Sequence, residues 1–124
     1  MMRNLLKYIE KFKELKEIKW GGGKQDDGTI QFSFPLYPVF VHEFEEELYR
    51  LELSNATYGD TMDKNGWWDQ KKMIQDIPRM NDAEVIAALT AIYRGERFCD
   101  GLINEFIKNG AIVLLLEQLK THLE

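Results

Sequence analysis

The sequence contains one cysteine, no long apolar run and no excess of basic residues, and each shortage excludes a class of protein. Cys99 is the only cysteine among 124 residues, so an internal disulfide is impossible and we expect a reducing cytoplasm. The longest run of large apolar residues, Ile112–Leu116, is far shorter than the roughly 20 residues that cross a bilayer, so we expect no membrane span. The first residues, Met1–Lys7, lack the apolar stretch and cleavage site of a signal peptide.

Clustered basic residues are missing from most of the chain. The formal net charge is −5, and residues 21–70 hold three Lys or Arg against ten Asp or Glu. Residues 1–20 hold six Lys or Arg against three Glu, so only the first helical stretch is mildly basic. Because phosphate backbones are bound by clustered Lys and Arg, we expect no nucleic-acid partner.

Apolar residues recur at three- and four-residue steps in about five stretches, which predicts about five amphipathic helices. The stretches are residues 5–18, 39–52, 82–95, 98–107 and 112–123. Polar and apolar residues alternate over Thr29–Phe34, after an Asp27-Gly28 pair that suits a tight turn, which predicts a short antiparallel β-hairpin near residues 17–35. Residues 54–66 show no periodicity and are predicted to form a surface loop. The predicted fold class is therefore α+β and mostly helical, in a single domain of residues 1–124.

No arrangement of residues in the sequence indicates a cofactor or a metal. Gly21–Lys24 lacks the spacing of a phosphate-binding loop, since Ile18 stands where the first glycine belongs. His42 and Glu46 have the i,i+4 spacing of two metal ligands, but a solvated acidic helix face explains them without a metal, and the only other histidine is His122. We therefore expect no metal and no cofactor, and we assign no catalytic residue.

Trp67 and Trp68 are adjacent, and two neighbouring side chains cannot both point inward from one helix or strand. We expect one indole to pack and the other to lie near the surface, where large aromatic side chains serve as binding anchors. The alternative is that both indoles cover the core beneath a long loop. The pair is our candidate interaction surface.

The stretch between two of the predicted helices, residues 94–101, is rich in charge. It carries four charged side chains, Arg94, Glu96, Arg97 and Asp100. Arg97 and Asp100 are three residues apart and can form an ion pair, while Glu96 can accept hydrogen bonds from either arginine. The cluster is either a structural clasp that sets the angle between two helices or a site for an anionic ligand.

Four features occur together along the chain: a Trp20-Gly21-Gly22 turn, the Asp27-Gly28 hairpin, a strand that ends near Pro35, and an Arg-x-x-Arg-Phe-x-x-Gly signature at Arg94–Gly101. In this combination they resemble an uncharacterised domain-of-unknown-function family of small bacterial proteins. The resemblance implies a cytoplasmic bacterial α+β protein with no established activity.

Two functions of different classes fit the sequence. We favour a binding or protein-interaction module, because the chain shows no nucleophile–base pair, metal spacing or cofactor loop but does have an acidic helix and an indole pair. The alternative is a small enzyme or ligand-binding protein in which Arg94 and Arg97 hold an anionic group, with Glu96 or Asp100 as acid or base. Cys99 as a nucleophile would need a nearby base, and we expect it to be buried and inert. The partner is thus an unknown protein or a small anionic ligand, and the oligomeric state is left open.

Overall fold

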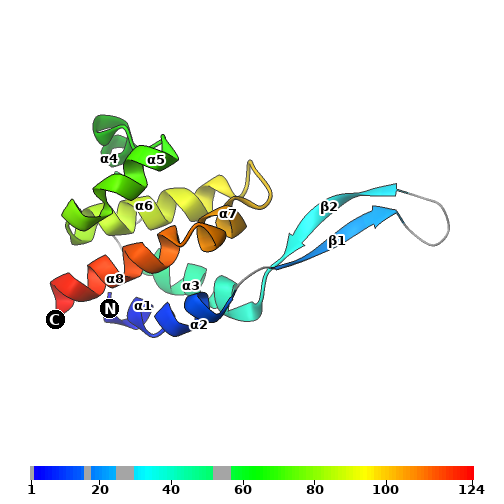
Figure 1. The fold of residues 1–124 in the computed structure, drawn as a ribbon, viewed down its shortest axis with the longest axis horizontal. Coiled ribbons are helices and arrows are strands. Elements are labelled where there is room, and N and C mark those ends of the chain that lie inside the picture. The colour runs from blue at the N-terminus through cyan, green and yellow to red at the C-terminus, as the bar shows by residue number, and fades with distance from the viewer. Residues whose placement is uncertain (1, 16–17, 25–29, 52–56) are drawn as a thin grey trace.

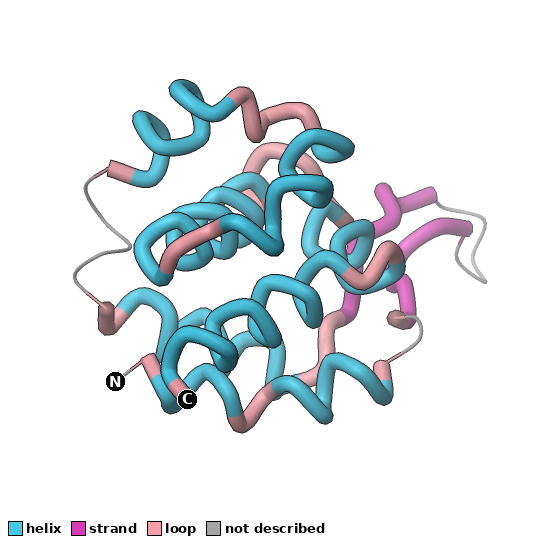
Figure 2. The backbone as a smooth tube through the Cα atoms, turned by 60° about the vertical axis from the view of Figure 1, so that its left-hand side comes forward, coloured by secondary structure: helices cyan, strands magenta, loops and turns pink. Residues whose placement is uncertain are grey.

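The computed structural model describes residues 2–15, 18–24, 30–51 and 57–124, which form a helical body with a projecting β-hairpin (Figure 1; Figure 2). The helices are α1 (Arg3–Leu6), α2 (Ile9–Glu14), α3 (Val39–Tyr49), α4 (Tyr58–Asn65), α5 (Gln70–Asp76), α6 (Asp82–Gly95), α7 (Leu102–Lys108) and α8 (Ala111–Leu123), with a short 3-10 turn, η2, at Ile77–Arg79. The strands are β1 (Lys19–Lys24) and β2 (Ile30–Leu36). The predicted fold class, mostly helical with an antiparallel hairpin, is confirmed.

The described residues contain more helices than the five predicted. The apolar stripe at the N-terminus is continuous in sequence, yet the helix is interrupted at Lys7 and Tyr8, which separates α1 from α2. The predicted loop of residues 54–66 is wrong from Tyr58 onward, where α4 begins, and residues 52–56 lie outside the described residues. Only Met62 of α4 is buried, so this polar helix leaves little apolar periodicity in the sequence. Its end is well specified, because Gly66 adopts left-handed backbone (φ 71°) and donates its N–H to carbonyls of the last turn.

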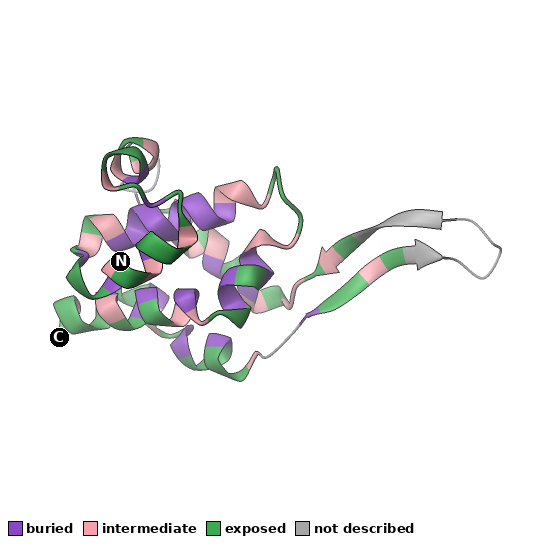
Figure 3. Cartoon of the chain, turned by 45° about the horizontal axis from the view of Figure 1, so that its top comes forward, coloured by how far each residue is buried: buried purple, intermediate pink, exposed green. Residues whose placement is uncertain are grey.

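The core is built around α6, in which every residue from Val85 to Tyr93 is buried. The helix predicted over residues 82–95 is present, and it begins with a capping box. Asn81 Oδ1 accepts the Glu84 N–H and Glu84 Oε1 accepts the Asn81 N–H, both at 2.9 Å. Helices α3, α4, α7 and α8 all contact α6, so α6 lies inside the body. Figure 3 shows that buried residues gather on the helices of the body, while the described side chains of the strands are exposed or half-buried. Within the described part of the chain, no helix has the length and apolar character that crossing a bilayer requires.

β1 and β2 pair antiparallel and extend away from the helices as a two-stranded ribbon, which we call the arm (Figure 1). The register pairs Lys19 with Leu36, Trp20 with Pro35 and Gly21 with Phe34, and it shifts between Gly21 and Gly23. The Phe34 ring lies over Gly21, where an added Cβ would come within 2.5 Å of ring atom Cε2, so the ring fills the space of the missing side chain. The predicted Asp27-Gly28 turn lies outside the described residues.

Candidate functional site

Residues 94–101 form a bend between α6 and α7. Helix α6 ends at Gly95 and α7 begins at Leu102, and turns connect them. The Gly95 carbonyl accepts the backbone N–H groups of Phe98 and Cys99, each at 3.0 Å. The side chains from Arg97 to Asp100 are exposed, so the middle of the bend is a surface loop.

Glu96 is the side chain that holds this bend. Its Oε1 accepts the Ile103 N–H at 2.8 Å and the Tyr37 hydroxyl at 2.9 Å, and its Oε2 accepts the Gly101 N–H at 2.8 Å. Both amides belong to the N-terminus of α7, where the N-cap residue is Gly101 and has no side chain of its own to serve as a cap. The carboxylate of Glu96 therefore caps α7 from the end of the preceding helix, where its negative charge also suits the helix dipole.

Tyr37 connects this cap to the chain that follows β2. Its hydroxyl donates to Glu96 and accepts the Asn104 N–H at 3.0 Å. Burial raises the pKa of the Tyr37 hydroxyl above its ordinary value, although the Asn104 amide acts in the opposite direction. The hydroxyl therefore stays protonated and keeps its bond to the carboxylate.

The arginines of the bend do not form the predicted ion pair. Arg97 and Asp100 are exposed, and within the described residues they make no ion pair with each other. Arg94 instead lies over two rings, with its guanidinium carbon 5.3 Å from the centroid of Tyr49 and 5.6 Å from that of Tyr58. The bend is thus held by a carboxylate on backbone amides and not by the Arg97–Asp100 pair.

The arm is seated on the same bend. Gly101 has a positive φ of 92°, and a Cβ on it would lie 2.8 Å from Cη2 of Trp20. The side chain of Leu102 fills the corresponding space beside Gly95. Trp20-Gly21-Gly22, predicted to be a turn, belongs to strand β1, in which Trp20 and Gly21 pair with β2. Trp20 and Gly101, the final glycine of the signature, are far apart in sequence but contact each other.

The two adjacent tryptophans lie in different environments. Trp67 is 4% exposed and donates its Nε1–H to Asp76 Oδ2 at 2.9 Å, whereas Trp68 is 57% exposed and donates to Asp63 Oδ1 at 2.5 Å. The expectation that one indole packs and the other lies near the surface is confirmed, and the alternative that both cover the core is wrong.

Asp76 anchors the buried indole within a small polar network. The hydrogen bond from Trp67, together with the Lys72 ammonium at 2.9 Å, lowers the pKa of Asp76 to about 2. Arg79 also pairs with this carboxylate. The turn that carries both tryptophans is therefore tied to the end of α5, which fixes the position of the exposed Trp68.

Two hollows in the surface meet at the Trp68 indole. The first, of about 180 Å³, is mainly apolar and includes Met62, Met73, Ile92, Leu102 and Phe106 in its lining. The second, of about 160 Å³, is lined by Tyr58, Ala91, Arg94, Gly95 and Phe98 in addition to Trp68. Ala91 lines both hollows, so they are neighbouring parts of one surface feature, which we call the Trp68 groove. The groove brings the candidate interaction surface, Trp68, next to the charged bend.

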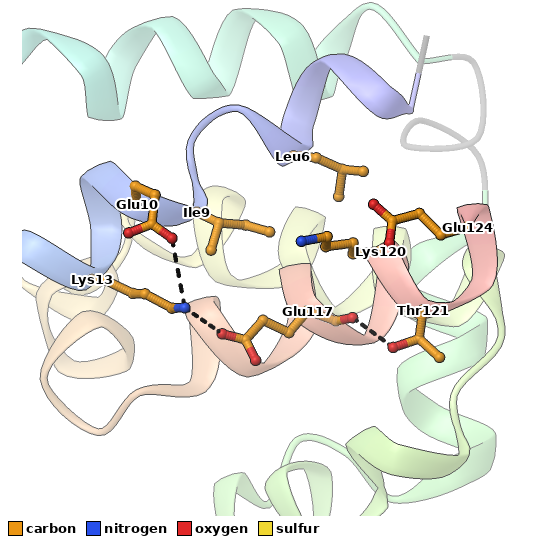
Figure 4. Close-up of a pocket in the computed structure, with 8 residues that line it drawn as sticks. All are labelled: Leu6, Ile9, Glu10, Lys13, Glu117, Lys120, Thr121 and Glu124. Atoms are coloured by element: carbon orange, nitrogen blue, oxygen red, sulfur yellow. Dashed lines mark hydrogen bonds and ion pairs between the residues drawn. The ribbon is translucent and has the colours of Figure 1, made fainter.

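A larger hollow, of about 500 Å³, lies between α1, α2 and α8 (Figure 4). Lys13 lies there between Glu10 Oε1 at 3.7 Å and Glu117 Oε1 at 3.1 Å. These three side chains are 45–77% exposed, so they form a solvated ion-pair network that joins α2 to α8. We give this hollow no functional assignment.

The residues considered for nucleophile or metal chemistry lie on separate elements of the described chain. Cys99 is exposed, so the expectation that it would be buried is wrong: the residue lies in the bend before α7 and not on an apolar helix face. His42 and Glu46 are both exposed on α3. Among the residues that the structure describes, no three His, Cys, Asp or Glu side chains are grouped to hold a metal ion.

Comparison with known proteins adds a family but no activity. Residues 1–124 match DUF6508, described as a family of unknown function. The chain belongs to this family. No curated protein and no solved structure matches this DUF6508 chain. The Arg94–Gly101 signature and the bacterial origin suggested by the resemblance stay predictions.

The sequence analysis missed three residues that belong to the candidate site of this DUF6508 chain. Tyr37 stands between two prolines, and its place in an extended link gave no periodic signal. Tyr58 belongs to the stretch that was predicted to be a loop. Phe98, 91% exposed, was counted in an apolar helical pattern, although α7 begins only at Leu102. The one signal that could have identified Phe98 is its place in the sequence, as a large aromatic residue next to Arg97 and three residues from both Gly95 and Gly101.

Proposed function

We propose that this DUF6508 chain is a binding module whose site is the Trp68 groove, and that the groove holds an apolar segment of a partner polypeptide. The observation that carries the proposal is the half-exposed Trp68 indole between two hollows, with the exposed Phe98 ring at the edge of one of them. Large aromatic side chains beside apolar hollows are the usual anchors of protein interfaces. Helices from both halves of the chain pack on α6, so we propose that residues 1–124 act as one domain.

The two anchors alone do not give a tight complex. Covering the exposed parts of Trp68 and Phe98 would remove roughly 250 Å² of apolar surface from water, a gross gain of about 6 kcal/mol. Association costs of about 4–15 kcal/mol offset this gain, and a micromolar complex needs about 8 kcal/mol net. Contacts between the partner and the groove walls therefore have to supply most of the net affinity.

The alternative is a small anionic ligand held by the charge cluster. Arg94 supports it, because this arginine lines the hollow beside Tyr58 and Trp68. Glu96 weighs against it, since its carboxylate caps α7, and Arg97 and Asp100 do not line the groove. A role as a small enzyme has no further support, because the exposed Cys99 is not among the residues that line either hollow.

Selection of displayed linear peptides on the purified protein tests the proposal, with Trp68→Ala as the counter-selection target. Trp68 is exposed, so this variant keeps the fold, whereas Trp67→Ala would disturb the core and serves no such purpose. In two-dimensional NMR spectra, a selected peptide should shift the indole signal of Trp68 and leave that of Trp67 nearly unchanged. If every recovered peptide binds the Trp68→Ala variant as tightly as it binds the wild-type protein, the proposal is contradicted.

A bacterial cytoplasm is the setting that we propose for this module. The support is a lone cysteine with an exposed thiol, which suits a reducing compartment, together with the family resemblance.

A further inference from the structure

Large apolar side chains are exposed on the arm as well as at the groove. Among the described residues, Phe34 and Leu36 of β2 are 43% and 47% exposed. They are two residues apart on one strand, so they lie on the same face of the ribbon, while Trp20 on the other face packs on Gly101. An isolated two-stranded ribbon is marginally stable in water, and here only the base of the ribbon is seated on the body. Within the described part of the chain, no other segment buries the face of the arm that carries Phe34 and Leu36.

The arm and the groove are complementary in shape and charge. The arm projects from the helical body (Figure 1). It carries the exposed apolar side chains of Phe34 and Leu36, whereas the groove is a mainly apolar hollow. Lys19, at the start of β1, is exposed and basic. Two carboxylates lie beside the groove: Asp63 accepts from Trp68, and Glu105 accepts from Gln70 at 3.2 Å.

We propose that the Trp68 groove binds the arm of a second copy of this chain, in a two-fold dimer in which each arm lies in the groove of the other copy. The inference rests on the proposed function, since it names the occupant of the same groove. A two-fold arrangement lets both arms and both grooves be covered at once, because the same contact occurs twice. β2 has seven residues and is about 23 Å long, so the arm can cross the boundary between two bodies.

The expected affinity follows from the area. Phe34, Leu36, Trp68 and Phe98 would each bury on the order of 100 Å², so eight such side chains give roughly 800 Å² over both contacts. With the neighbouring backbone and Lys19, the interface approaches the lower limit of about 1,200 Å² for a specific complex. We therefore expect a dimer that dissociates in the micromolar range.

Sedimentation equilibrium of the full chain, from about 1 to 200 μM, measures this dimer. Leu36→Glu on the arm and Trp68→Ala in the groove should each raise the dimer dissociation constant at least about tenfold. Leu36 is paired with Lys19 across the ribbon, so the Leu36→Glu substitution adds an opposite charge beside that lysine and keeps the strand pair. The matched control is Leu114→Glu on α8, where the leucine is 45% exposed and lines neither hollow of the groove. Circular dichroism verifies that all three variants are folded.

Mixing the two dimer-breaking variants gives the decisive result. A mixed dimer keeps one intact contact, the arm of the Trp68→Ala chain in the groove of the Leu36→Glu chain, so an equimolar mixture should associate more strongly than either variant alone. A monomeric wild type, a Leu36→Glu variant that dimerises normally, or a mixture no stronger than its components would each overturn the inference. The proposed function is tested separately, because the Leu36→Glu chain has a free groove. Peptide binding to that groove, together with a wild type that stays monomeric, rejects only the inference. Absence of both peptide binding and a wild-type dimer rejects the inference and the proposed function together.

Discussion

Replacing Glu96 by glutamine tests whether one carboxylate holds the bend between α6 and α7. An amide has a single oxygen, so Glu96→Gln can keep the two bonds to Oε1, from Ile103 and Tyr37, or the bond to Oε2, from Gly101, but not all three. In the better orientation the new NH₂ group faces the Gly101 N–H, and two donors oppose each other. Loss of a hydrogen bond to a charged group costs about 1.5–3 kcal/mol. Because the site is partly exposed, we expect Glu96→Gln to lower the free energy of unfolding by about 1.5 kcal/mol, the low end of that range. Glu96→Ala removes all three bonds and should cost about 2–4 kcal/mol.

Urea unfolding followed by circular dichroism measures both losses, and thermal unfolding should show a decrease of about 3–5 °C per kcal/mol for a chain of this size. The matched control is Glu46→Gln on the exposed face of α3, which should change the free energy of unfolding by less than about 0.5 kcal/mol. Hydrogen exchange gives a local readout, since the amides of Gly101 and Ile103 should exchange faster in Glu96→Gln. If Glu96→Gln is as stable as Glu46→Gln and these two amides keep their protection, the capping role is refuted.

Three further predictions concern the seat of the arm and the tryptophan turn. Gly101→Ala should lower the free energy of unfolding by at least about 2 kcal/mol, because its φ of 92° disfavours a side chain and its Cβ would displace Trp20; calorimetry measures the loss, and a neutral variant would mean that this contact is not made. Trp67→Ala should cost about 3–5 kcal/mol and Trp68→Ala less than about 1 kcal/mol in denaturant unfolding, and equal losses would contradict the assigned burial. The lowered pKa of Asp76 stabilises the folded state at pH values above 3.8, and this contribution is lost as the pH falls toward about 2. The stability difference between wild type and Asp76→Asn should therefore shrink over that interval in acid titrations, and a difference that does not depend on pH would exclude the role of this carboxylate.

The parts of the fold that were predictable are those in which the information is local. The capping box of α6 joins Asn81 to Glu84, three residues apart, and the apolar stretch after it is continuous. α4 was missed because a short polar helix with one buried residue, Met62, has no stripe to detect. The break between α1 and α2 was missed for the opposite reason: the apolar residues keep their helical spacing through the turn at Tyr8.

The candidate site was predictable in its location but not in its bonding. The sequence placed residues 94–101 between two predicted helices, and α6 and α7 are indeed joined there. The partners of Glu96, however, are the Tyr37 hydroxyl, 59 residues away, and backbone amides, which no pattern of side chains can reveal. The sequence analysis paired the charged residues with each other, and the Arg97–Asp100 ion pair that it allowed is not formed among the described residues. The same limit applies to the Trp68 groove, since its two walls come from helices that meet only in the folded chain.

The bond between Tyr37 and the Asn104 amide has a consequence for the order of events during synthesis. The two residues are 67 positions apart, so at about 5–20 residues per second the ribosome needs roughly 3–13 seconds to add the second after the first. For that interval the nascent hairpin has no C-terminal helix on which to dock, and its aromatic residues are open to water and to neighbouring chains. The segment that contains Tyr37 can therefore dock on α7 only after Asn104 has been translated.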